Sequence, residues 1–169
     1  MSLERLWAGW RGTYVAGAGE PTTPEECVLC RVVGELDGEA AEQQLHAGER
    51  IVALLNAYPY NNGHLLVMPR RHVPDLTDLD GDETAELWAT VTDAVAAVRT
   101  AYEPGGLNVG LNLGRAGGAG IPDHLHVHVL PRWAGDTTFT TTIAGTRVIP
   151  ESLDVSGQRL RAAWPHHRT

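Results

Sequence analysis

The 169-residue sequence contains only two cysteines, Cys27 and Cys30, so it cannot build the disulfide framework on which many small secreted domains depend. It also lacks any uninterrupted apolar run near the roughly 20 residues that a membrane-spanning helix needs. The opening "MSLERLWAGWRG" has an early acid and no hydrophobic core, unlike a secretory signal. We therefore expect a cytoplasmic protein with no membrane association.

Positive charge is scarce as well: 13 lysines and arginines stand against 21 aspartates and glutamates, for a formal net charge of -8. A general nucleic-acid binder needs a basic surface to displace counterions from the phosphates, so this class is disfavoured. A nucleotide as a small substrate stays possible. A local site can be rich in backbone N–H donors while the whole surface is acidic.

The apolar share of 43% and the charged share of 20% are ordinary for a globular protein, and the length suits one domain. We divide the chain into an N-terminal arm (1–26), one domain (27–150) and a C-terminal tail (151–169). The tail is polar, and we expect it to fray.

Strands and one long helix are the predicted elements. Apolar residues recur at spacings of three and four between Leu87 and Tyr102, which predicts an amphipathic helix. A shorter partial helix is predicted after Cys27. β segments are predicted at ERIVALLN, HLLVMPRRH, LNVGLNLG, HLHVHVLP and TTFTTTIAGTRVIP, the first two as an antiparallel hairpin. Together these elements indicate an α+β fold.

Three histidines, His124, His126 and His128, alternate with aliphatic residues in "DHLHVHVLPRW". Successive side chains of a strand point to opposite faces, so the three imidazoles should share one face. Three interpretations compete: a solvated polar face, a three-histidine metal centre that activates water, and nucleophilic catalysis at phosphorus by one imidazole. The glycine-rich "GRAGGAGIPD" just before the strand could form an anion nest, which favours phosphate chemistry.

The segment "HLHVHVLP" fits His-φ-His-φ-His-φ-φ, where φ is apolar, and resembles the histidine triad (HIT) family of nucleotide hydrolases and transferases. The similarity covers roughly residues 27–150 in the family's order. It implies a HIT-like fold, with an antiparallel sheet of about five strands, one long helix and a shorter one, and a homodimer formed by the helix and a strand edge. Within the family, "NAYPYNNGHLLVMPRR" and "NVGLNLG" look most like actinobacterial diadenosine tetraphosphate phosphorylases.

The resemblance also assigns roles to residues. It implies that His126 is the nucleophile, forming a nucleotidyl-histidine that water or phosphate then releases, with no catalytic metal. His128 would contact the phosphate and assist proton transfer, and His64 would lie near the phosphate site, although either could instead be a packing residue. Asn56 would contact the ribose, or alternatively only cap a turn.

Asn112 and a loop would surround the phosphates, the loop residues being Gly117, Gly118, Ala119 and Gly120. Much of the family has a glutamine at the place of Gly120, and the related phosphorylases tend to have a serine. The choice of acceptor therefore stays open. Trp133 could border the site, or simply pack at the end of a strand.

A second group of residues is spaced as in zinc-binding family members and in the related galactose-1-phosphate uridylyltransferases: Cys27, Cys30, His72 and His124. Two thiolates and two imidazoles would make a closed structural zinc site. The alternative is a pair of buried free cysteines. The phosphorylase relatives lack these ligands, so zinc and the phosphorylase assignment point in different directions.

The resemblance thus implies a nucleotide hydrolase or nucleotidyltransferase acting on a purine nucleotide, dinucleoside polyphosphates being the first choice. Two alternatives from other classes remain. One is a nucleotide-binding regulatory protein with little turnover, and the other is a three-histidine metalloenzyme.

Overall fold

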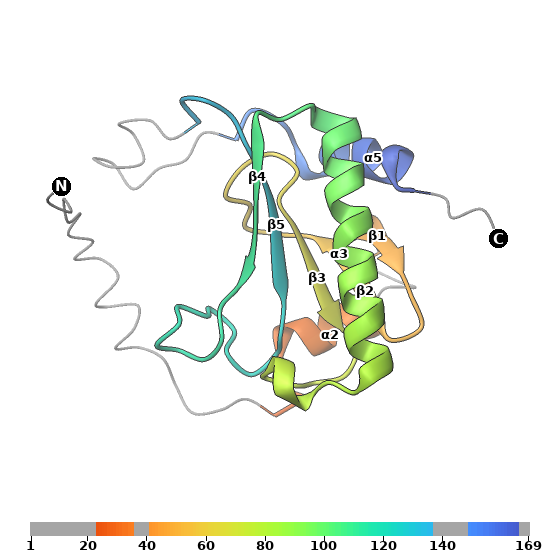
Figure 1. The fold of residues 1–169 in the computed structure, drawn as a ribbon, viewed down its shortest axis with the longest axis vertical. Helices are drawn as coiled ribbons and strands as arrows, with labels where there is room; N and C mark the ends of the chain where they lie inside the picture. Colours follow the sequence, from red (N-terminus) through yellow and green to blue (C-terminus); the bar gives the residue numbers. More distant parts are fainter. Residues whose placement is uncertain (1–22, 36–40, 137–148, 166–169) are drawn as a thin grey trace, which may run out of the picture.

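The computed structural model describes residues 23–35, 41–136 and 149–165, and its centre is a five-stranded antiparallel sheet in the order β1-β2-β3-β5-β4 (Figure 1). The predicted α+β HIT-like fold is confirmed. The strands are β1 (Gln44–Ala47), β2 (Ile51–Leu55), β3 (Leu65–Pro69), β4 (Gly106–Leu111) and β5 (Val127–Arg132). The helices are α2 (Val28–Gly34), α3 (Gly81–Tyr102) and α5 (Leu153–Ala163), with short 3-10 turns at Ala41–Gln43 and Leu76–Asp78.

Strands β2 and β3 are apolar along their whole length because both faces of the sheet are covered there. Ile51, Ala53 and Leu55 pack in the cluster that contains α3, whereas Val52 and Leu54 pack with Cys27 and Leu29 on the opposite face. The two strands pair antiparallel in the predicted hairpin. A helix of the N-terminal segment therefore covers one face, and α3 with α5 covers the other (Figure 1).

Helix α3 has clear start and stop signals. Asp80 and Glu83 form a capping box, each side chain bonded to the other's backbone N–H. The helix ends at Glu103, whose φ of 44° lies in the left-handed region, just before Pro104. Within α3, Glu86 accepts hydrogen bonds from the N–H groups of Arg50 and Ile51, which joins the helix to the β1–β2 turn.

The C-terminal segment differs from the sequence prediction. Residues 153–163 form helix α5 rather than a fraying tail, and Leu160 and Trp164 belong to the main core. A serine at the N-cap, Ser152, accepts a hydrogen bond from the N–H of Val155. The tail was misjudged because two of the three buried α5 residues, Ser156 and Gly157, are small rather than apolar.

The sheet also has a strand that was not predicted. β1 has a single buried residue, Leu45, and too little alternation to be recognised in the sequence. The predicted β segment TTFTTTIAGTRVIP falls mostly on residues 137–148, outside the described residues, as does the N-terminal arm up to residue 22.

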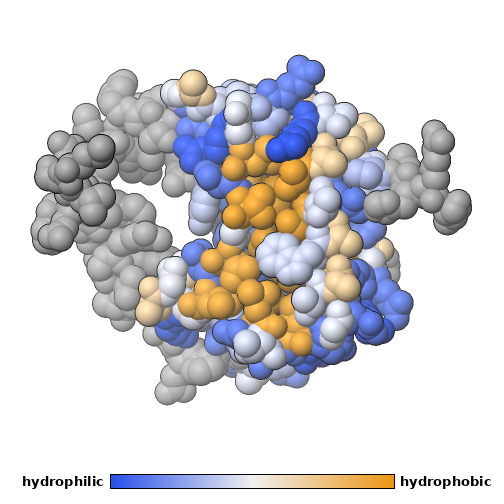
Figure 2. Space-filling view, in the orientation of Figure 1, coloured by the Kyte–Doolittle hydropathy of each residue, from blue (hydrophilic) through white to orange (hydrophobic). Residues whose placement is uncertain are grey.

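An apolar strip runs down the α3–β4 side of the molecule (Figure 2). Exposed apolar side chains on these two elements include Trp88 of α3 and Val109 of β4, at 45% and 43%. Among the helices described, none is long and apolar enough to cross a membrane.

Candidate active site

The three histidines lie where β5 begins, on an extended segment that only partly belongs to the strand. β5 starts at Val127, so His128 is in the strand whereas His124 and His126 precede it, and the predicted start of this strand was too early. The intervening aliphatic residues still pack in the α3 cluster as predicted. The rings of His126 and His128 are neighbours, with centroids 5.0 Å apart.

His126 is held by a backbone carbonyl. Its Nδ1 lies 2.7 Å from the carbonyl oxygen of His124, which can only accept, so Nδ1 carries the proton and Nε2 is the unprotonated nitrogen. Only 7% of the residue is exposed, and this burial lowers the pKa of His126, partly offset by the hydrogen bond to that carbonyl. A neutral imidazole with a lone pair on Nε2 is the form that can attack an electrophile.

His64 and His128 form a second hydrogen-bonded unit. The N–H of Tyr60 donates to Nδ1 of His64 over 3.0 Å, so the neutral His64 ring carries its proton on Nε2. That Nε2 lies 2.9 Å from Nδ1 of His128 and donates to it, which leaves the His128 proton on its own Nε2. Burial first, and then the neighbouring His126, lower the pKa of His128 to about 4.

Asn56 and Tyr60 surround His64 from the β2–β3 turn. The Asn56 amide lies 3.3 Å from Nδ1 of His64, and its Oδ1 accepts from the N–H of Tyr58, so this side chain has the turn-capping contact. The Tyr60 ring stacks beside His128, with centroids 5.9 Å apart. The sequence prediction missed Tyr60, because its main-chain N–H rather than its side chain makes the decisive contact.

The glycine-rich loop connects β4 to the histidine segment, and its backbone N–H groups donate hydrogen bonds to carbonyls within the loop. The N–H groups of Gly118 and Ala119 donate to the carbonyls of Arg115 and Gly114. Among the described residues, Asn112 is exposed and makes no hydrogen bond to the histidines. Among the described hydrogen bonds, none joins Asn112 or residues 117–120 to the histidines, and the phosphate role of these residues stays a prediction. Trp133 packs edge-on against Tyr102.

The four predicted metal ligands come together, although they are spread over almost one hundred residues of sequence. The ligand atoms of Cys27, Cys30, His72 and His124 all lie within 4.8 Å of one another. Sulfur-to-nitrogen distances are 3.6 Å from Cys27 and 3.4 Å from Cys30 to His124, and 3.1 Å from Cys30 to His72. With Zn–S near 2.3 Å and Zn–N near 2.0 Å, a tetrahedral site places such atoms about 3.5 Å apart, so the group fits zinc.

The chemistry of this cluster also favours a cation. His124 donates from Nε2 to the carbonyl of Pro69 over 2.9 Å, which leaves Nδ1 as the coordinating nitrogen. Burial first, and then the adjacent Cys27, raise the pKa of Cys30 to about 11, so its thiolate would form at neutral pH only beside a positive charge such as a metal ion. His124 therefore belongs with the cysteines, while His126 and His128 form a separate group.

The fold and the two histidine groups agree with the comparison to known families. The HIT domain family matches residues 37–135, and the chain belongs to this family. It is similar to the AP-4-A phosphorylase of Mycobacterium tuberculosis, with 41% identity over 96% of this chain and 85% of the relative. A bifunctional bis(5'-adenosyl)-triphosphatase/adenylylsulfatase of Arabidopsis thaliana is 39% identical over an alignment that covers 50% of this chain and 46% of the Arabidopsis protein.

Solved structures with the same fold include a zinc-bound histidine triad family protein from Mycobacterium smegmatis. It superposes with a TM-score of 0.66 at 31% identity, covering 83% of this chain and 94% of that one. A histidine triad nucleotide-binding protein from Sulfolobus tokodaii gives a TM-score of 0.65 at 27% identity, over 81% and 91%. The relatives from Mycobacterium tuberculosis and Arabidopsis thaliana are nucleotide-processing enzymes, which supports the same broad class for this chain.

Proposed function

We propose that the protein cleaves dinucleoside polyphosphates such as diadenosine tetraphosphate through a nucleotidyl-histidine intermediate on His126. The observation that carries this proposal is the fixed orientation of the His126 ring, with Nδ1 bonded to the His124 carbonyl and Nε2 unprotonated. The phosphorylase similarity over most of the chain supports the substrate class. The same proposal places the reaction in the cytoplasm, where free thiols stay reduced.

The steps follow from the histidine geometry. Nε2 of His126 attacks the α-phosphorus, the bond to the bridging oxygen breaks, and the leaving nucleotide departs with that oxygen's electron pair. Nε2–H of His128 donates a hydrogen bond to a phosphate oxygen, and His64 keeps that proton on Nε2 by donating to Nδ1 of His128. Phosphate or water then attacks the intermediate, and the imidazole leaves in its original form. Splitting one displacement into two allows either acceptor.

Zinc has a structural role in this proposal. Cys27, Cys30, His72 and His124 would hold it as a closed tetrahedral site, which joins α2 to the segment that carries His126. The zinc-bound relative supports this assignment. The four protein ligands fill the coordination sphere, so the chemistry at phosphorus depends on the free histidines.

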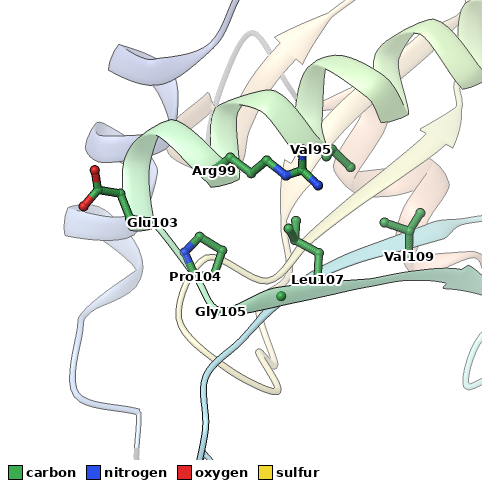
Figure 3. A pocket seen from close by; sticks show the side chains of 8 residues that line it. Val95, Arg99, Glu103, Pro104, Gly105, Leu107 and Val109 are labelled. Carbon is green, nitrogen blue, oxygen red and sulfur yellow. The ribbon is translucent and has the colours of Figure 1, made fainter.

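We also propose a homodimer formed through α3 and β4. β4 is the last strand of the sheet, with a free edge among the described strands. The apolar strip beside it includes Val95, Leu107 and Val109, which line a pocket between α3 and the start of β4 (Figure 3). A second copy would pair with the strand edge and cover this strip.

Product analysis tests the proposed reaction. The full chain is incubated with diadenosine tetraphosphate, with and without inorganic phosphate, and the nucleotides are separated by chromatography. We expect ADP and ATP only when phosphate is present, because the 41% identical relative is a phosphorylase. AMP and ATP without phosphate would show hydrolysis, and no turnover under either condition would contradict the proposal.

A further inference from the structure

The β2–β3 turn, residues 56–63, determines where the protons of the His64–His128 pair reside. Two donors of this turn, the N–H of Tyr60 and the amide of Asn56, make Nδ1 of His64 an acceptor, and this in turn makes His64 the donor to His128. If the turn moved away from His64, its ring could carry the proton on Nδ1 instead of Nε2, and His128 would then become the donor of the pair. His128 would then present a lone pair instead of an N–H group to an anionic phosphate.

One side of this turn is fastened to the end of β5. The Asn61 amide donates to the Asp136 carboxylate over 2.9 Å and to the Pro131 carbonyl over 3.4 Å. Asp136 is itself fixed, because Arg132 donates to both of its oxygens over 2.7 and 2.8 Å. The Asp136 side chain is only 8% exposed, so the anchor is shielded from water.

The other side of the turn rests on the last residue of α3. Gly63 has a φ of 69°, and a Cβ built there would lie 2.5 Å from the Tyr102 ring, so the ring packs directly against the Gly63 backbone. The Tyr102 hydroxyl donates to Glu151 over 2.9 Å. Arg159 of α5 lies 3.5 Å from Glu151 and 5.1 Å from the centroid of the Tyr102 ring.

We propose that Asn61 and Tyr102 are positioning residues, which hold the turn from two sides so that His64 and His128 keep one proton arrangement. His64 is fully buried and follows Gly63 directly, so any displacement of the turn reaches the ring at once. The arrangement itself follows from geometry, and only its catalytic effect rests on the proposed function. The C-terminal helix thereby contributes to the site from the opposite face of the sheet.

Two variants test this proposal in the full-length protein. Asn61→Ala removes both hydrogen bonds of the amide, and Tyr102→Phe removes the hydrogen bond to Glu151 that fixes the ring against Gly63. The ¹⁵N chemical shifts of the ring nitrogens of His64 and His128 report which nitrogen carries the proton. We expect wild type to show Nε2–H on both rings, and both variants to show a mixture. Turnover should fall about tenfold in kcat, with KM within about twofold.

Asn108→Ala is the matched control, because Asn108 accepts from the same Arg132 but does not touch the turn. It should keep the wild-type ring-nitrogen shifts. If folded Asn61→Ala and Tyr102→Phe also keep them, the proposal is wrong, whatever their activity. Because Tyr102→Phe conserves the packing, a folded variant remains if Asn61→Ala fails to fold. Absence of nucleotide turnover in wild type would contradict the proposed function and leave the spectroscopic test intact.

Discussion

The three histidines that alternate in sequence have different roles in this account, because in each ring one nitrogen is hydrogen-bonded to a different partner and only the other is available. His124 donates to the Pro69 carbonyl and turns Nδ1 toward the two cysteines. His126 donates to the His124 carbonyl and keeps Nε2 unprotonated. His128 accepts from His64 and keeps its proton on Nε2. Sequence spacing predicts that the side chains lie together, but it carries no information about these partners.

Protonation of His128 should destabilise the fold in mild acid. Its pKa lies near 4 in the folded protein and near 6.5 when unfolded, so between these values the unfolded state binds more protons. The free energy of unfolding should therefore decrease as the pH falls from about 6.5 to 4, by roughly 1–2 kcal/mol after allowance for solvent screening. Urea unfolding at pH 7 and pH 5 measures this. His128→Asn should show a smaller decrease, and an equal decrease in both proteins would contradict the assignment.

At the scale of elements, the sequence predicted the helices and strands that bury an apolar face or are apolar throughout. It did not predict those whose packing depends on small or polar residues. The apolar runs of β2 and β3 and the apolar periodicity of α3 are visible in the sequence and were predicted. Helix α5 and strand β1 were not, because few of their residues are both apolar and buried: Leu160 in α5 and Leu45 in β1. The Tyr60–His64 contact depends on a main-chain group and could not be read from side-chain types.

Helix α5 should be essential for stability although its sequence is polar. Leu160 is fully buried against the main core, so Leu160→Ala removes apolar contacts and leaves a cavity. We expect a loss of about 2–5 kcal/mol in the free energy of unfolding, measured by urea denaturation. Val155 lies on the same helix but is 46% exposed, and Val155→Ala should cost under about 1 kcal/mol. Similar losses in both variants would show that α5 does not pack as described.

Zinc should connect α2 to the histidine segment. Protein purified without added metal should contain about one zinc per chain, and a strong chelator should lower Tm. Cys30→Ser should contain little zinc, and the chelator should not change its Tm further. A wild-type protein without zinc, whose two thiols are both freely titratable, would contradict the metal site.

At the scale of the whole molecule, the proposed dimer surface and the histidine group lie on opposite faces of the sheet. Leu66 pairs with His128 and packs in the cluster around Cys27, whereas Val95 and Leu107 pack against the α3 cluster. Dimer formation and nucleotide cleavage can therefore be tested with separate substitutions.

A charge in the apolar strip should prevent dimer formation. Val109 is 43% exposed on the edge strand, so Val109→Lys places an ammonium group where a second copy would exclude water. We expect wild type to sediment as a dimer and the variant to shift at least tenfold toward monomer in analytical ultracentrifugation. Asp154→Lys, at an exposed position on α5 rather than on α3 or β4, is the charge control. A wild-type monomer, or a variant dimer of unchanged affinity, would contradict this surface.

The central claim is that His126 forms a covalent bond to phosphorus, and peptide mass spectrometry tests it most directly. The protein is mixed briefly with diadenosine tetraphosphate without phosphate, quenched in alkali, where a phosphoramidate survives, and digested. The account predicts an adenylyl group on His126 in wild type and in His128→Asn, and none in His126→Ala. Efficient turnover by His126→Ala, or an adenylyl group on another residue, would contradict the account.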